Sequence, residues 1–158
     1  MPPRFDRLDL RILDELQRDA TLSLVELAER VRSSKSVCWR RIQRFEEDGI
    51  IASRVAVLDP EKTGFEVMVL LFIRVDGRGE NRMAETIAAI REIPEIVECH
   101  ALMGDIDLFA KVIVPTIKDY ERLMWGRLAA VPGIVDMRSS ISLTRFVNST
   151  RLPLEALG

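Results

Sequence analysis

The first fifty residues repeat their hydrophobic positions at intervals of three or four, the spacing that gathers side chains on one face of an α-helix. The first such stripe consists of Phe5, Leu8, Ile12 and Leu16. Asp6 and Asp9 stand at its start, where an acidic side chain caps the first turn and interacts favourably with the helix dipole. We therefore predict an amphipathic helix that begins just after Asp6.

Two more helices are predicted from their capping residues. Ser23 and Glu26 have the spacing of a capping box, and a short apolar pattern follows them. Ser34 is a suitable N-cap for a third, longer helix, which Gly49 ends. A short helix, a tight turn and a longer helix form the helix-turn-helix arrangement.

The remaining chain has the patterns of strands alternating with helices. Residues 50–60 alternate in character and end in Asp-Pro, which predicts a strand followed by a turn. Strand, helix and strand patterns then follow twice, and the segments IPEIVE and VPGIVD repeat the same helix end and strand start. The order βαββαβ predicts a ferredoxin-like domain with a four-stranded antiparallel sheet and both helices on one face.

The first strand of this domain reads VMVLLFI, so its two faces are both apolar. Helices cover only one face of such a sheet, and an open apolar face is an association surface. We therefore expect a homodimer that forms through the sheets.

Charge changes the interpretation of the third helix. The chain has 23 Lys and Arg residues against 25 Asp and Glu residues, a net charge of −2. Between Arg30 and Arg44, however, six basic residues occur without a single acid, and acids return at Glu46. The absence of acids in this window could simply reflect a helix face that is exposed to solvent. A helix that enters the DNA major groove must also exclude carboxylates, because phosphates flank it on both sides.

The predicted DNA-contacting residues lie on the outer face of this helix. Its N-terminal half carries small or hydrogen-bonding side chains suited to base edges. Arg41 lies nearer the core and is interpreted as a structural ion-pair partner, and Trp39 either packs on the first helix or contacts DNA. The candidate set is Ser34, Lys35, Ser36, Trp39, Arg40, Gln43 and Arg44.

A turn in the second half is the other candidate site. Gly104 permits a tight connection, and Asp105 and Asp107 stand two residues apart between apolar strands. A polar hairpin in which the carboxylates bond local amides explains the pattern without a ligand.

These segments together resemble the Lrp/AsnC (feast/famine) transcriptional regulators. The resemblance runs from FDRLDLRILDELQRDA through RRIQRFEEDGII and VLDPEKTGF to MGDIDLFAKVIVP and VPGIVDMRSSISLTRF. It implies a winged helix-turn-helix domain at 1–51, a linker strand at 52–64 and a βαββαβ (RAM-type) oligomerisation and effector-binding domain at 65–158. It also implies double-stranded DNA as a partner and dimers that assemble further, commonly to octamers.

The resemblance further implies that an amino acid or related metabolite binds between dimers at the Gly-Asp-x-Asp turn. The corresponding residues are Met103, Gly104, Asp105, Ile106 and Asp107, with Ser139 as a rim hydroxyl. Met103 and Ile106 replace more polar residues of the family, which predicts a neutral aliphatic or aromatic effector. Arg32 replaces the usual Gly of the turn before the recognition helix, so either Arg32 has a positive φ or the turn differs.

Catalysis is not expected. The single histidine, His100, lies in a strand pattern, and no metal-ligand spacing or cofactor motif is present. A sirohaem-decarboxylase-like enzyme and a small-molecule sensor with vestigial DNA binding are the alternatives. Cys38 and Cys99 are far apart in apolar surroundings, and no signal peptide or membrane span is indicated. A cytoplasmic, nucleoid-associated protein is expected.

Overall fold

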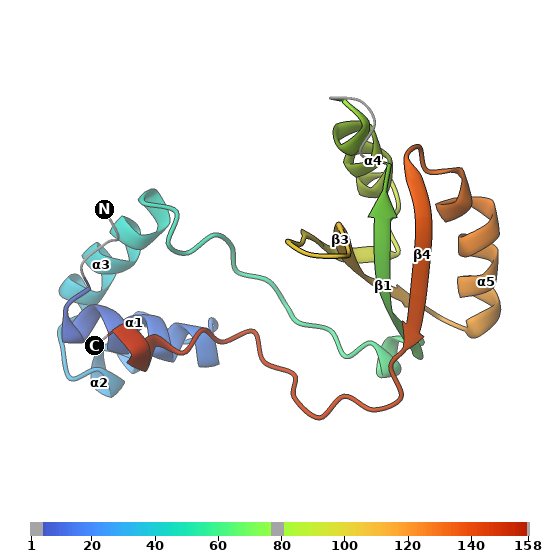
Figure 1. The fold of residues 1–158 in the computed structure, drawn as a ribbon. Coiled ribbons are helices and arrows are strands. Elements are labelled where there is room, and N and C mark those ends of the chain that lie inside the picture. Colours follow the sequence, from blue (N-terminus) through green and yellow to red (C-terminus); the bar gives the residue numbers. More distant parts are fainter. Residues whose placement is uncertain (1–4, 77–80, 158) are drawn as a thin grey trace. The chain divides into compact units, whose positions relative to one another are not determined.

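The computed structural model describes residues 5–76 and 81–157, and the chain divides into two compact units. One unit combines Met1–Val57 with Val147–Gly158, and the other is Leu58–Phe146. The chain therefore passes between the units twice (Figure 1). The family resemblance implies one domain over residues 65–158, whereas Val147–Gly158 group with the helices.

The helical unit contains α1 (Arg7–Arg18), α2 (Leu24–Arg30) and α3 (Lys35–Glu47). Both α1 and α2 begin with a capping box, formed by Asp6 with Asp9 and by Ser23 with Glu26. Ser34 caps α3 through its side chain, which accepts a hydrogen bond from the Val37 N–H at 3.3 Å. The predicted helix starts and the helix-turn-helix order are confirmed.

The C-terminal segment packs on α1. Its short 3-10 helix η3 (Leu154–Leu157) brings Leu154 against the apolar core of the helical unit. Arg151 forms an ion pair with Asp14 at 2.8 Å, and the Gln17 amide bonds the backbone N–H and carbonyl of Leu152 at 2.6 and 3.3 Å. No pattern in the sequence predicted this contact.

The predicted strand in residues 50–60 is absent; the described chain there is extended but has no strand partner. Its apolar side chains Val55, Val57 and Leu58 are exposed. Alternation suits a strand, but a strand also needs a hydrogen-bonded neighbour, and this unit supplies none among its described residues. The 3-10 helix η1 (Glu61–Thr63) follows.

The other unit is a four-stranded antiparallel sheet with two helices. Its elements are β1 (Val67–Val75), α4 (Arg82–Arg91), β2 (Ile96–Ala101), β3 (Leu108–Val114), α5 (Ile117–Gly126), the 3-10 helix η2 (Leu128–Ala130) and β4 (Ile134–Ile141). The strand order β2-β3-β1-β4 confirms the predicted ferredoxin-like topology.

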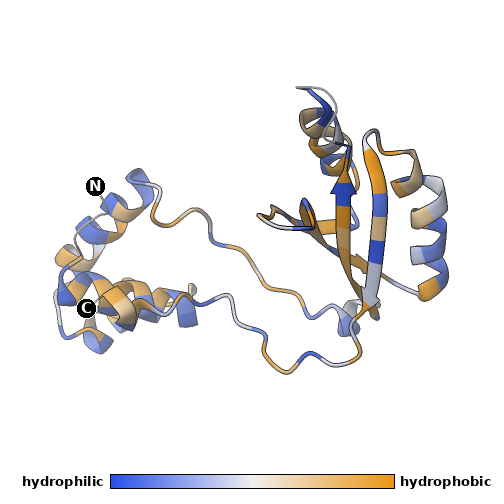
Figure 2. Cartoon of the chain, viewed as in Figure 1, coloured by the Kyte–Doolittle hydropathy of each residue, from blue (hydrophilic) through white to orange (hydrophobic). Residues whose placement is uncertain are grey.

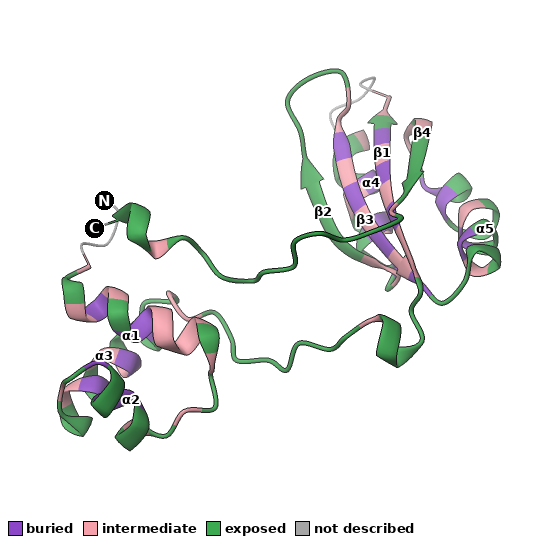
Figure 3. Cartoon of the chain, turned by 90° about the horizontal axis from the view of Figure 1, so that it is seen from below, coloured by how far each residue is buried: buried purple, intermediate pink, exposed green. Residues whose placement is uncertain are grey.

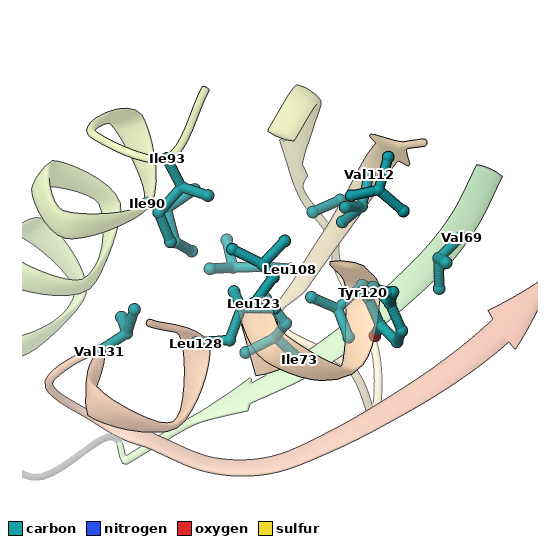
Figure 4. Packing of buried hydrophobic residues seen from close by; sticks show 13 residues of the cluster. Val69, Ile73, Ile90, Ile93, Leu108, Val112, Tyr120, Leu123, Leu128 and Val131 are labelled. Carbon is teal, nitrogen blue, oxygen red and sulfur yellow. The ribbon is translucent and has the colours of Figure 1, made fainter. Parts of the chain in front are cut away.

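One face of this sheet forms the core with both helices (Figure 4). Alternate residues of β1 and β3 are fully buried there against Ile90 of α4 and Leu123 of α5. Buried positions alternate along β1 and β3, whereas β2 is mostly exposed (Figure 3). Among the described helices, none is long and apolar enough to cross a membrane.

The opposite face of the sheet is also apolar at its centre. We call it the outer face; its hydrophobic residues are Met68, Leu70, Phe72, Phe109 and Ile113, each only partly buried. The Phe72 and Phe109 rings lie 5.6 Å apart between centroids. Figure 2 shows β1 coloured hydrophobic along most of its length. Nothing in the described chain covers this face as the helices cover the other.

Candidate nucleic-acid interface and effector site

The outer face of α3 presents a continuous polar and basic surface. Ser34, Lys35, Ser36 and Arg40 are exposed, and Trp39 is 52% exposed. The opposite face of the helix buries Cys38, Ile42 and Phe45 in the core of the unit. Packing therefore fixes which side of α3 faces outward, and that side contains no carboxylate before Glu46.

The two C-terminal members of the predicted DNA set have protein partners. The Gln43 side chain donates to Glu46 at 3.1 Å. Arg44 pairs with Asp9 at 2.8 Å, and its guanidinium lies 5.1 Å from the centre of the Phe45 ring. The Arg44 side chain is still 48% exposed. Within the predicted set, Lys35 and Arg40 are the cations that form no ion pair with a described residue. DNA contact by the whole set remains a prediction.

Arg41 anchors α3 on α1, as its position in the pattern indicated. It pairs with Asp6 at 2.5 Å and with Asp9 at 2.7 Å, and the Asp9 side chain is only 3% exposed. The hydrogen bond to Asp9 is the largest cause that raises the pKa of Arg41. The Asp9 N–H and Arg41 together lower the pKa of the Asp6 carboxyl. These ion pairs hold α3 at a fixed angle to α1.

The turn before α3 is strained at one residue. Arg32 has a φ of 50°, which side-chain-bearing residues rarely adopt, so the first of the two alternatives from the sequence is the one observed. The Arg32 and Ser33 N–H groups bond the carbonyls of Glu29 and Ala28, at the end of α2. This conformation lets α3 leave the turn with Ser34 in position to cap it.

In the second unit, the Gly104–Asp107 turn connects β2 and β3. Gly104 has a φ of 143° with no heavy atom within 4 Å of the place where a Cβ would lie. One Asp107 oxygen accepts the Val75 N–H at 2.8 Å, which extends the β1–β3 ladder by one bond. Asp107 therefore positions the turn, while Asp105 is exposed.

A hollow of about 490 Å³ lies beside this turn. Its lining contains Gly104, Asp105 and Asp107 together with Arg74 of β1 and Arg138 of β4. The sequence pattern does not indicate these arginines, because each is about thirty residues from the turn along the chain. The strand order alone would place the end of β1 between the turn and β4.

The other predicted effector residues lie outside this lining. The Met103 side chain is fully exposed, and Ile106 is partly buried. The Ser139 hydroxyl lies 2.5 Å from the Tyr120 hydroxyl of α5. The structure thus brings Gly104, Asp105 and Asp107 to one hollow and gives Ser139 a different partner.

Comparison with known proteins identifies both units. Residues 5–52 match the winged helix-turn-helix DNA-binding family, and residues 68–152 match the Lrp/AsnC ligand binding domain. The chain belongs to the Lrp/AsnC family. It is a DNA-binding transcriptional regulator with an effector-binding domain, and its relatives are regulators rather than enzymes.

Relatives of this Lrp/AsnC regulator align over nearly its whole length. The glutamate uptake regulatory protein of Zymomonas mobilis is 37% identical over 96% of this chain and 92% of its own. The leucine-responsive regulatory protein of Escherichia coli is 33% identical over 95% of this chain and 92% of its own. A Neisseria meningitidis regulator solved in complex with L-methionine has a TM-score of 0.93 and 29% identity over 97% and 99% of the two chains.

Proposed function

We propose that this Lrp/AsnC regulator reads DNA through the outer face of α3 and responds to an amino acid bound at the Gly104–Asp107 turn. It acts as a homodimer that assembles further, on the pattern of four dimers in an octamer, and works on the nucleoid in the cytoplasm. The observation that carries the proposal is the exposed, acid-free face of α3 between Ser34 and Arg44.

The distribution of charge favours the N-terminal half of α3 as the part that enters the groove. Lys35 and Arg40 are exposed and form no ion pair with any described residue, so they are available to phosphates and bases. Each phosphate that a cation neutralises releases condensed counterions, which favours binding at low salt. Arg44, already held by Asp9, is suited to a contact at the edge of the interface.

Charge also supports an amino acid as the effector. The hollow beside Gly104 carries both carboxylates and guanidinium groups, and an amino acid carries both opposite charges. The related regulator from Neisseria meningitidis was solved with L-methionine. An effector that binds the assembled and dispersed proteins with different affinity must shift the equilibrium between them.

The outer face of the sheet supports a dimer. Five hydrophobic side chains gather there without cover from the described chain, and a second copy can bury the same residues symmetrically. In such a dimer, a two-fold axis relates the two copies of α3. This symmetry predicts near-palindromic operators, with half-sites about one helical turn, or a multiple of it, apart.

The DNA assignment is tested with duplexes that the parent protein selects from a random-sequence pool. Arg40→Ala should weaken binding by roughly 1–3 kcal/mol and relax specificity if Arg40 contacts a base. Lys35→Ala, as a loss of a phosphate contact, should lower the slope of log affinity against log salt by about 1. Fluorescence anisotropy at several salt concentrations measures both quantities.

Arg91→Ala is the matched control, because Arg91 is exposed on α4 in the other unit. It should leave DNA affinity unchanged. Parent-like binding by both Arg40→Ala and Lys35→Ala would show that this face of α3 does not enter the groove. A parent protein that selects no duplex but binds amino acids would instead be a sensor without DNA binding.

A further inference from the structure

Two arginines beside the effector turn have no structural role that accounts for them. Arg74 is exposed, and its side chain makes no hydrogen bond or ion pair with the described residues. Arg138 is 71% exposed at its side chain, and its one ion pair is a 3.7 Å contact from Nε to Asp136. By contrast, Arg41 holds two carboxylates at 2.5 and 2.7 Å.

The sheet register places both arginines on the outer face, next to each other. Arg138 lies opposite Phe72, and Asp136 lies opposite Arg74, in the antiparallel β1–β4 pair. Arg74 and Arg138 are therefore diagonal neighbours, at a separation that long side chains span. The register shifts between Arg74 and Val75, and such bulges re-aim the side chains beside them.

Asp107 fixes this geometry from the other side. Its carboxylate accepts the N–H of Val75, the residue just after the bulge, so the turn is bonded to the strand end that carries Arg74. Arg74, Arg138, Asp105 and Gly104 then surround one hollow of about 490 Å³. That volume falls within the range of roughly 300–1,000 Å³ that small-molecule sites have.

We propose that Arg74 and Arg138 bind the α-carboxylate of the amino-acid effector, while Asp105 receives its ammonium group. This assignment rests on the proposed function of the turn and names the residues that select an intact amino acid. Guanidinium groups hold carboxylates through paired, charge-assisted hydrogen bonds. A simple anion is repelled by Asp105 and Asp107, and a simple cation by the arginines, so a zwitterion fits best.

The test compares amino acids with their α-amides, which keep the ammonium and the side chain but lose the carboxylate. Full-length protein is titrated calorimetrically with L-leucine, L-methionine and L-glutamate, and with the α-amide of each. A pH of about 6.5 keeps the amino groups of both ligands protonated, because even an α-amino group next to an amide has a pKa of about 7.7–8.0. For each amino acid that binds, the α-amide should bind at least tenfold more weakly.

The arginine variants test the named residues. Arg74→Gln and Arg138→Gln should each weaken binding of the amino acid at least tenfold and should not weaken binding of the amide, because the amide has no carboxylate for the arginines to hold. Arg74→Lys and Arg138→Lys keep the charge but lose the forked donor. Their affinities for the amino acid should lie between those of the parent and the glutamine variants. Arg91→Gln, on exposed α4, is the control and should bind as the parent does.

Three results would overturn the assignment. If the parent bound an amino acid and its amide with equal affinity, the protein would not recognise the α-carboxylate, and no result with the variants could restore the assignment. Unchanged amino-acid affinity in the glutamine variants would assign the carboxylate to other groups. Either result leaves the amino-acid effector in place. Binding of none of the amino acids to the parent would overturn both the effector and its receptor.

Discussion

Arg32 shows how a single residue can store strain beside a functional helix. Its φ of 50° places a side-chain-bearing residue in the left-handed region, which costs roughly 1–2 kcal/mol. The side chain is exposed and has no partner among the described residues that would offset this cost. The departure of this residue from the family pattern was visible in the sequence, and its consequence is backbone strain between α2 and α3.

Arg32→Gly should therefore stabilise the protein. Glycine removes the strain but loses about 0.5–1 kcal/mol through the greater freedom of the unfolded chain, so a net gain of up to about 1.5 kcal/mol is expected. Urea unfolding followed by circular dichroism measures this difference. Arg30→Gly, at the last residue of α2, should destabilise by about 1 kcal/mol, because it lowers helix propensity and removes the ion pair with Glu15. Equal destabilisation by both variants would contradict the strain at position 32.

At the scale of elements, capping predicted more than alternation did. Asp6, Ser23 and Ser34 each act within a few residues, so their local chemistry fixed the helix starts without knowledge of the fold. The strand expected in residues 50–60 failed because pairing depends on a neighbour that a sequence does not show. Arg74 and Arg138 were missed for a similar reason, since only the strand order brings them to the turn.

The contact between α1 and α3 gives a prediction at the same scale. Arg41→Ala removes two ion pairs and, among the described residues, leaves the nearly buried Asp9 with Arg44 as its one ion-pair partner, so the free energy of unfolding should fall by roughly 1.5–3 kcal/mol. Thermal unfolding at pH 7 measures the loss. Arg40→Ala, one residue away and exposed, should change stability by less than about 0.5 kcal/mol.

The pH dependence of the same variant supplies an internal check. The pKa of Asp6 is lowered from its ordinary value of 3.8 by the Asp9 N–H and by Arg41. The folded protein then binds fewer protons than the unfolded chain, so this contribution is present above pH 3.8 and lost as pH falls through the lowered pKa. The stability difference between the parent and Arg41→Ala should narrow in that acidic range, by the part that Arg41 contributes through Asp6. If the stability difference between the parent and Arg41→Ala stayed constant down to pH 2, Asp6 would not contribute to the stabilisation by Arg41.

For the whole molecule, the outer sheet face predicts the assembly. Leu70 lies at its centre, opposite Ser140 and Lys111 on the neighbouring strands. Leu70→Lys should dissociate the dimer, because a charge placed in an apolar interface loses its hydration. Light scattering should give at least twice the chain mass of 18.0 kDa for the parent and a single chain for the variant. Val55→Lys, on exposed chain of the helical unit, is the control. A monomeric parent at micromolar concentration would refute the interface.

The packing of the C-terminal segment on α1 has a consequence during protein synthesis. Gln17 and Leu152 bond each other across 135 positions of sequence, and the whole sheet unit is encoded between them. At a translation rate of about 5–20 residues per second, the ribosome takes roughly 4–18 s to make residues 58–146. During that interval, the surface of α1 that binds the C-terminal segment remains uncovered in the nascent helix-turn-helix. The unit whose residues are translated first is therefore the last to be completed.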